Sequence, residues 1–244
     1  MKNQIGKGTL YLIPTPLADV VPALVMPEET LFQLRQLKFL IVEQIRTARR
    51  LLKKIDQQID IDSVTFFELN KFTDPAQINS FLQPLLNGND AGLISEAGSP
   101  CVADPGALVV KVAHELTIRV KPLSGPSSIN QALMGSGFNG QSFCFHGYPP
   151  IQPEERQKFI KTLEKESMQK NQTQIFIETP FRNTQLLDAL LKTCQPATLL
   201  CIASNLSGPD EVIQTKSMAS WEKKRPDIHK KPTVFILYNP SSRV

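Results

Sequence analysis

The sequence has little of what marks membrane or metal proteins. No apolar run among its 244 residues approaches the roughly 18 residues that a membrane-spanning helix needs. Its 3 histidines stand apart and its 4 cysteines include no CxxC pair, so metal catalysis is not expected. Prolines and Asp19 interrupt the apolar stretch near the start, where a signal peptide would lie. We therefore expect a cytoplasmic protein without a membrane partner.

Neither sign of charge dominates the chain. With 27 Lys and Arg against 23 Asp and Glu, the net charge is +4, which permits a polyanionic partner without requiring one. An apolar fraction of 41% and a charged fraction of 20% are typical of a globular protein and unlike a disordered one. A chain of this length can form one large domain or two of about 120 residues each.

One stretch of small residues, LISEAGSPCVADPG at 93–106, breaks the regular pattern. Leu93 and Ile94 end a short apolar run that is typical of a buried strand. Asp104 is expected to cap the helix that follows, with Pro105 in its first turn. In open α/β sheets, such a strand–loop–helix arrangement places the loop at the carboxyl edge, where ligands bind.

The same loop carries groups that can hold a ligand. We expect Gly98 to allow close approach to the backbone or to adopt a positive φ. Three side chains of the loop can exchange hydrogen bonds with a ligand, namely Ser95, Glu96 and Ser99. Taken alone, the loop could equally be an ordinary connection.

Strand and helix patterns alternate through the first half of the chain. Strands are expected at 8–13, 39–42, 64–68, up to 94, and at 119–123, and one helix is expected from Asp74 to about Asn87. The alternation predicts an α/β domain over residues 1–122, with a mainly parallel sheet covered by helices on both faces.

The second half has a different order of elements, which predicts a mixed-sheet α+β domain over residues 123–244. Two helices, at 153–168 and 182–193, separate the first three of five strands, expected at 143–145, 174–178, 198–203, 212–214 and 233–238. The polar and basic segment from Lys216 to Lys231, which includes Trp221, is expected to be a surface excursion.

A basic helix follows the strand at 39–42. Its positive residues share one face at helical spacing, and they are Arg46, Arg49, Arg50, Lys53 and Lys54. The opposite, core-facing stripe consists of Ile45, Ala48, Leu52 and Ile55. A face of one sign at a strand end can contact phosphates, or it can simply be solvated.

Five segments stand in this order: GTLYLIPTPLADV at 8–20, FLIVEQIRTARRLL at 39–52, LISEAGSPCVADPG at 93–106, PLSGPSSI at 122–129 and IFIETPFRN at 175–183. Together they resemble the tetrapyrrole methylase superfamily of S-adenosylmethionine (SAM) enzymes. The branch they resemble most is ribosomal RNA small-subunit (cytidine 2′-O) methyltransferase I, which methylates a ribose hydroxyl.

The resemblance implies a two-domain, homodimeric methyltransferase with SAM as cofactor in a cleft between the domains and ribosomal RNA as partner. At matching positions the cofactor would be lined by Thr15, Pro16, Gly98, Ser99, Val102, Ser127, Ser128, Glu178, Ala203, Pro232 and Thr233. We add Ser95 to this set for its hydroxyl.

The sequence departs from the family at polar positions that could hold a substrate. Gln44 replaces the acid of a Glu-Asp pair, Phe181 replaces a histidine, and Asn205 replaces a glutamate. The cofactor loops are kept, so SAM binding is expected while the acceptor stays open. A ribose of RNA, a small molecule or tetrapyrrole-like acid, and a SAM- or RNA-binding module without turnover are the alternatives.

Methyl transfer to a hydroxyl needs alignment of the acceptor and gains from a general base. The loop carboxylates available are Glu43, Glu96 and Asp104, and Asp104 is expected to act as a helix cap. We therefore predict Glu43 as the base, with Arg46 beside it to hold a phosphate.

Overall fold

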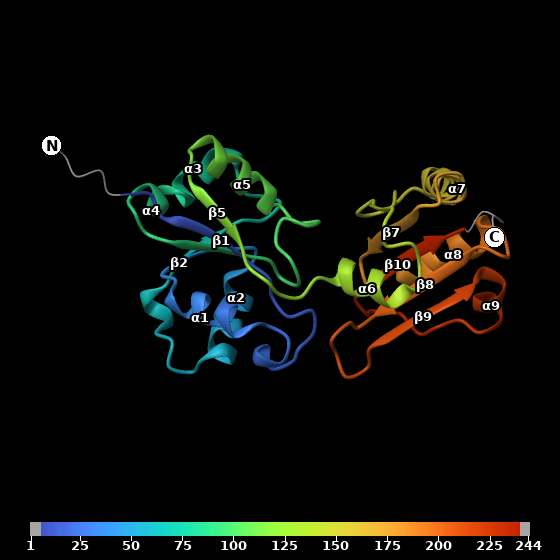
Figure 1. Ribbon diagram of the computed structural model, residues 1–244, viewed down its shortest axis with the longest axis horizontal. Coiled ribbons are helices and arrows are strands. Elements are labelled where there is room, and N and C mark those ends of the chain that lie inside the picture. The colour runs from blue at the N-terminus through green and yellow to red at the C-terminus, as the bar shows by residue number, and fades with distance from the viewer. Residues whose placement is uncertain (1–5, 240–244) are drawn as a thin grey trace. The chain divides into compact units, whose positions relative to one another are not determined.

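The computed structural model describes residues 6–239 and divides into two compact units between Ser127 and Ser128 (Figure 1). The division lies a few residues after the boundary expected at residue 122, because the connecting segment is bonded to the first unit. The Leu123 amide donates to the Leu12 carbonyl at 2.9 Å, and the Thr30 hydroxyl donates to the Ser124 carbonyl at 2.7 Å. No helix within residues 6–239 is both long and apolar enough to cross a lipid bilayer.

The first unit contains a parallel sheet of five strands in the order β3-β2-β4-β1-β5. Its strands are β1 (Thr9–Ile13), β2 (Phe39–Val42), β3 (Thr65–Glu68), β4 (Ala91–Ile94) and β5 (Arg119–Pro122). Neighbouring strands all pair in parallel, as in Leu12 opposite Leu93. The loops that follow β1, β2 and β4 therefore emerge at the same edge of the sheet.

Helices cover both faces of this sheet, as the alternating pattern predicts (Figure 1). One face is covered by η1 (Pro22–Leu24), α1 (Glu28–Gln36), α2 (Ile45–Ile55) and η2 (Ile61–Ser63), and the other by α3 (Ile78–Phe81), α4 (Gln83–Leu86) and α5 (Gly106–Glu115). A separate hydrophobic core lies on each face of the sheet. Leu40 of β2 packs into the core under α1 and α2, and the next residue, Ile41, packs into the core on the opposite face.

The single helix expected from Asp74 to Asn87 is wrong. The segment forms three short pieces, η3 (Pro75–Gln77), α3 and α4, because Pro84 lies in the first turn of α4 and cannot donate a helical hydrogen bond. Asp74 does cap the first piece, since its Oδ1 accepts from the Ala76 amide at 2.9 Å. Asp104 likewise accepts from the Gly106 amide at 2.7 Å, although α5 begins only at Gly106.

The second unit contains a mixed sheet in the order β6-β7-β10-β8-β9. Its strands are β6 (Phe143–Phe145), β7 (Thr173–Glu178), β8 (Leu199–Ser204), β9 (Val212–Ser217) and β10 (Thr233–Tyr238). Only β6 and β7 pair in parallel, and the other neighbours are antiparallel. The fold class expected from the sequence is confirmed.

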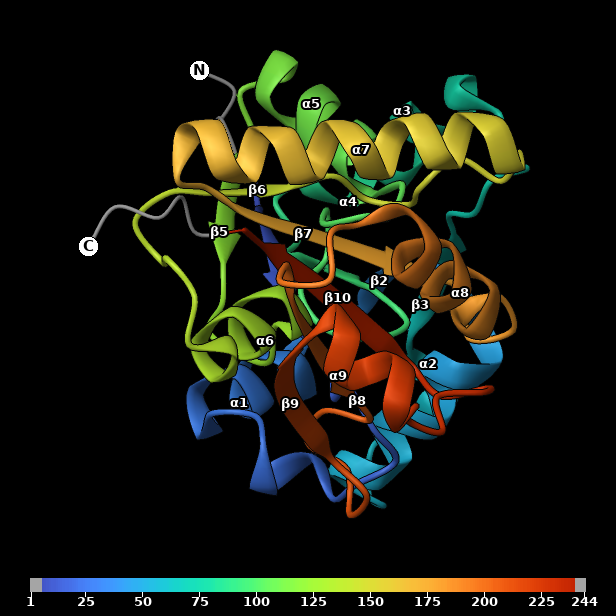
Figure 2. The same cartoon turned by 90° about the vertical axis from the view of Figure 1, so that its right-hand side faces the viewer.

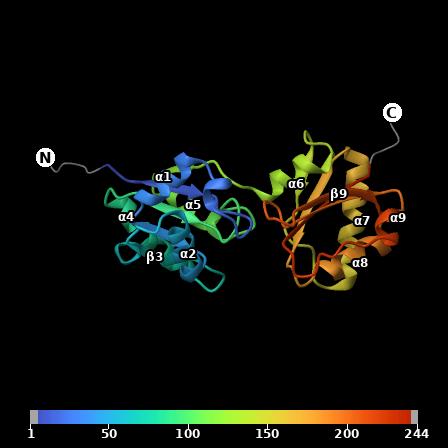
Figure 3. The ribbon, with the colours of Figure 1, turned by 90° about the horizontal axis from the view of Figure 1, so that it is seen from below.

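Four helices accompany this sheet: α6 (Ser128–Ser136), α7 (Pro153–Lys170), α8 (Asn183–Thr193) and α9 (Met218–Lys223). Figure 3 shows α6 on one face and the other three on the opposite face. The expected surface excursion around Trp221 is wrong, because Trp221 is only 1% exposed and belongs to the core. Its Nε1 donates to the Leu200 carbonyl at 2.8 Å, and the lysines around it reach solvent.

Candidate active site

Backbone hydrogen bonds join the loops that follow β1 and β4. The Thr15 amide donates to the Gly98 carbonyl, the Gly98 amide donates to the Thr15 carbonyl, and both distances are 3.0 Å. The Thr15 hydroxyl adds a bond to the Ser95 carbonyl at 3.2 Å. Gly98 has a φ of +76°, which confirms the positive φ expected there. The two loops therefore form one backbone surface at the carboxyl edge of the sheet.

The serine hydroxyls of this edge are engaged within the first unit. Ser95 Oγ donates to the Gly98 carbonyl at 2.8 Å, and Ser99 Oγ donates to the Pro126 carbonyl at 3.2 Å. These bonds fix the loop after β4 and tie it to the segment after β5. Pro16 is half-buried beside them, whereas the Val102 side chain is exposed.

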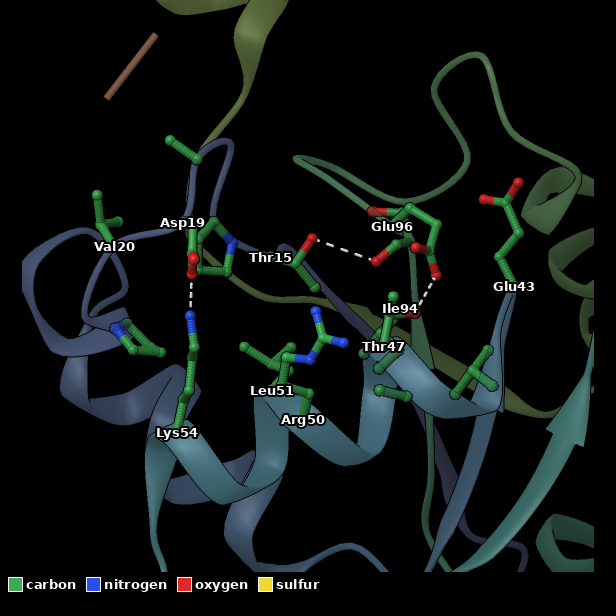
Figure 4. A pocket seen from close by; sticks show the side chains of 16 residues that line it. Thr15, Asp19, Val20, Glu43, Thr47, Arg50, Leu51, Lys54, Ile94 and Glu96 are labelled. Carbon is green, nitrogen blue, oxygen red and sulfur yellow. Dashed lines mark hydrogen bonds and ion pairs between the residues drawn. The ribbon is translucent and has the colours of Figure 1, made fainter. Parts of the chain in front are cut away.

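A pocket of about 270 Å³ opens at this edge (Figure 4). Thr15, Pro16 and Ser95 form one part of its lining, and Glu43 and Glu96 contribute carboxylates. Further lining comes from one face of α2, namely Thr47, Ala48, Arg50, Leu51 and Lys54. Its volume and mixed lining suit a polar molecule of about nucleotide size.

Two polar side chains of α2 are held in place around this pocket, those of Thr47 and Lys54 (Figure 4). Thr47 Oγ1 donates to Glu96 Oε1 at 2.6 Å, and Lys54 is paired with Asp19 of the loop after β1. Thr47 was missed in the sequence, although its spacing of four residues after Glu43 could have indicated one helical face, whereas Arg50 was expected only as part of the basic face.

Glu43 lies in the loop between β2 and α2, and its environment disfavours the charged carboxylate. Burial raises its pKa most, and the negative charges of Glu96 and Asp104 raise it further. Burial also raises the pKa of Asp104, against hydrogen bonds from the Gly106 and Cys101 amides. Glu43 is thus a half-buried carboxyl that binds a proton more strongly than an exposed one, as a general base should.

The uniform basic face expected on α2 is divided in the structure. Arg49 pairs with Asp62 at 3.7 Å and lies over the Phe66 ring, and Lys53 donates to the Gln57 and Ile59 carbonyls at 2.8 Å. Arg46 and Arg50 are exposed and have no hydrogen-bond or ion-pair partner within residues 6–239. Arg46 lies outside the pocket lining, whereas Arg50 belongs to it.

In the second unit, three of the predicted positions lie on neighbouring strands. Glu178 ends β7 opposite Thr233, the first residue of β10, and Thr233 in turn is opposite Ser204 of β8, which follows Ala203. Pro232 directly precedes this row, whereas Ser128 begins α6 and Ser127 ends the first unit.

Glu178 is a fully buried carboxylate with one free oxygen. Its Oε1 accepts from the Thr179 amide and from Arg182 Nη2, both at 2.6 Å, and this hydrogen bond raises the pKa of Arg182. Its Oε2 has no hydrogen-bond partner within the described chain. A buried acceptor without a donor is costly, so this oxygen is suited to a ligand that brings one.

Asn183 provides a second such acceptor and was missed in the sequence. Its Nδ2 donates to the Lys231 carbonyl at 2.7 Å and to the Ile228 carbonyl at 3.1 Å, while its Oδ1 lacks a partner within residues 6–239. Within the same residues no group of three or more His, Cys, Asp or Glu side chains is placed to hold a metal ion.

Comparison with known proteins finds homologues that are named methyltransferases. No family model matches the chain. A protein of Buchnera aphidicola subsp. Schizaphis graminum named ribosomal RNA small subunit methyltransferase I is 28% identical, over 96% of this chain and 80% of that protein. Its namesake from Escherichia coli O157:H7 is 26% identical, over 95% and 78%. The chain is a homologue of these methyltransferases.

Another relative with the same name, from Micromonospora olivasterospora, is 31% identical over 86% of this chain and 63% of that protein. Among solved structures, the methyltransferase CobJ has a TM-score of 0.63 at 15% identity, covering 96% of this chain and 94% of that chain. This likeness concerns the fold alone, and it confirms the two-domain fold class expected from the sequence, with a parallel sheet in one unit and a mixed sheet in the other.

Proposed function

We propose that the protein is a SAM-dependent methyltransferase that methylates a ribose 2′-hydroxyl of ribosomal RNA. The observation that carries the proposal is the joined edge formed by the Thr15 and Gly98 loops, with Glu43 beside it, in a homologue of small subunit methyltransferases. The edge offers backbone groups and small residues for a cofactor, and the pocket next to it offers a carboxyl for the acceptor.

The residues present fit SAM. Its amino and hydroxyl groups are hydrogen-bond donors, and the buried Glu178 Oε2 and Asn183 Oδ1 are acceptors without partners in the described chain. We propose the full predicted set as its ligands: Thr15, Pro16, Ser95, Gly98, Ser99, Val102, Ser127, Ser128, Glu178, Ala203, Pro232 and Thr233. When bound, SAM supplies a methyl group that is activated by the adjacent sulfonium.

The chain's own residues would then position and deprotonate the acceptor. In its ionised form, the Glu43 carboxylate accepts the proton of the ribose hydroxyl. Its raised pKa makes it a stronger base than an exposed glutamate. Arg50, inside the pocket, and Arg46, on the adjacent turn of α2, bind the phosphates that flank the ribose. Orientation of the hydroxyl supplies the rest of the rate enhancement.

The test is methyl transfer from labelled SAM to ribosomal RNA from cells that lack this protein. We expect label in the small-subunit RNA, at a ribose that resists alkaline cleavage after modification. Glu43→Gln should lower kcat by roughly 10²–10⁴-fold, the range for loss of a general base, with SAM affinity unchanged. Absence of label with active SAM binding would refute the RNA substrate.

A small-molecule acceptor is the second candidate, favoured by the internal pairing of part of the basic face. Arg49 and Lys54 already face carboxylates, which reduces the charge available to an RNA strand. Label recovered in a low-molecular-mass fraction of cell extract, and none in RNA, would assign this activity.

We further propose a cytoplasmic homodimer, on the basis of the family resemblance. Light scattering of the purified protein over a range of concentrations tests the dimer, and a mass equal to one chain of 27.2 kDa at every concentration would contradict it.

A further inference from the structure

Arg156 is a buried cation of the second unit that lacks a protein partner. It lies near the start of α7, is only 8% exposed, and its Nε has no hydrogen-bond partner within the described chain. No ion pair or side-chain hydrogen bond within residues 6–239 involves its guanidinium. Because a guanidinium stays charged in proteins, burial without a counter-charge is costly. An external anion would remove this cost.

The side chain lines a groove between α7 and α8, which pack side by side (Figure 2). The groove has a volume of about 410 Å³, more than a single tetrahedral anion occupies. Other hydrogen-bond donors of its lining are Gln157, Gln185, Lys192 and Thr193. The groove therefore combines one buried cation, one exposed cation and neutral donors from two helices.

Two carboxylates of the groove could oppose an anion. Asp188 Oδ1 accepts from Arg225 Nη1 at 2.5 Å, so its charge is compensated. Glu154 is exposed at the start of α7, where water and salt screen its charge. The balance inside the groove is thus positive and centred on Arg156.

We propose that this groove binds a phosphate group, with Arg156 as its principal ligand. The planar fork of an arginine matches two phosphate oxygens, and Lys192 supplies a second charge. The volume beyond the phosphate accommodates the atoms that carry it. The phosphate can come from an RNA strand or from a free phosphate compound, and the site does not depend on the proposed methyl transfer.

Inorganic phosphate is the probe for the site itself. At constant ionic strength, phosphate in place of chloride should raise the unfolding temperature of the full-length protein, because it binds the folded state. Calorimetry should show phosphate affinity weakened about tenfold or more in Arg156→Gln, as expected for loss of a charged bidentate partner. In chloride, this variant should unfold at the same or a higher temperature, since it removes an unpaired buried charge.

Lys161→Gln is the matched control, because it removes one exposed charge from the same helix. It should bind phosphate as the unchanged protein does. A second variant, Lys192→Gln, should weaken phosphate binding several-fold, which keeps the test open if Arg156→Gln does not fold. Equal phosphate affinity in all four proteins, or no binding to any, would overturn the proposal.

A salt titration of binding to a ribosomal RNA fragment distinguishes the two sources. If the phosphate belongs to RNA, Arg156→Gln should make the slope of log affinity against log salt shallower by about one unit relative to Lys161→Gln. If the slopes agree while binding of inorganic phosphate is lost, the ligand is a free phosphate compound. Absence of methyl transfer by the unchanged protein, together with phosphate binding that depends on Arg156, would refute only the proposed function.

Discussion

At the scale of single residues, Glu43 links stability to the proposed chemistry. Its folded pKa lies above the ordinary value of 4.5 because of burial and the neighbouring Glu96 and Asp104. A carboxyl with a raised pKa contributes stability that is fully present below its unfolded pKa and is lost as the pH rises through its folded pKa. Around neutral pH, Glu43 should therefore destabilise the fold.

Glu43→Gln should accordingly stabilise the protein at pH 8 and have no such effect at pH 4. Because the side chain is only half-buried, solvent screening should keep the gain below about 1 kcal/mol. Urea unfolding of both proteins at the two pH values measures it. A gain of equal size at both pH values would mean that the carboxylate charge is not its source.

Gly98 is the second residue with a definite test. Its φ of +76° disfavours any side chain, so Gly98→Ala should cost roughly 1–2 kcal/mol of stability and weaken binding of the proposed cofactor. Gly147→Ala is the matched control, because Gly147 has a φ of +66° and open space around it. Thermal unfolding measures the stability of both variants, and calorimetry measures their SAM affinity. Equal SAM affinities would exclude a ligand role for the Gly98 loop.

The sequence predicts a site residue only where its residue type demands a special backbone conformation or its place between expected elements indicates a loop. Gly98 was predictable because a glycine between strand and helix signals a special φ. Asn183 was not predictable, and Arg50 was predicted only as one of five cations on a uniform face, because the side chains that surround them come together only on folding. Arg50 lines the pocket and has no partner within residues 6–239, whereas Asp62 and Phe66 lie beside Arg49.

At the scale of elements, α2 starts at the carboxyl edge of the sheet and carries both paired and unpaired cations on its surface. Arg46 and Arg50 have no partner within residues 6–239, whereas Arg49 and Lys54 face Asp62 and Asp19. A phosphate can replace counterions only around cations that are not already neutralised by the protein. The two pairs should therefore contribute unequally to RNA binding.

The double variant Arg46→Gln/Arg50→Gln should make the slope of log RNA affinity against log salt shallower by about two units, for two lost phosphate contacts. The control Arg49→Gln/Lys54→Gln removes the same charge and should leave that slope nearly unchanged. A salt titration of all three proteins on one ribosomal RNA fragment provides the comparison. Equal slopes in both double variants would contradict a specific role for Arg46 and Arg50.

Long helices with a clear period and short apolar strands were predictable from the sequence, whereas the short helical pieces between residues 75 and 86 were not. The expected helix at 182–193 matches α8, and that at 153–168 lies within α7. The segment at 74–87 shows helical spacing, but Pro84 divides it. Trp221 was misjudged because lysines surround it in the sequence, while in the fold one turn of α9 turns its ring into the core.

At the scale of the whole molecule, each unit has its own hydrophobic core. Trp221, the only tryptophan of the chain, lies in the core of the second unit. Its fluorescence should thus report on unfolding of that unit, whereas far-ultraviolet circular dichroism reports on both. This provides a direct test of whether the units unfold separately.

Leu40→Ala in the first unit and Leu190→Ala in the second each remove a side chain that is 0% exposed, at a cost of about 2–5 kcal/mol. Leu190→Ala should lower the denaturant midpoint of the Trp221 fluorescence transition. Leu40→Ala should leave that midpoint unchanged and lower only the midpoint of the part of the dichroism transition that comes from the first unit. A fluorescence midpoint lowered equally by both substitutions would show that the units unfold as one.

The link between Thr15 and Gly98 has a consequence for how this protein can change over evolutionary time. Both hydrogen bonds use main-chain atoms, so they are inherited with the fold and do not depend on side chains at neighbouring positions. Side chains such as those of Glu43, Thr47 and Arg50 can then change around the pocket while the loops keep their positions. Substitutions in the pocket can therefore change which acceptor it binds without altering the backbone of the two loops that support it.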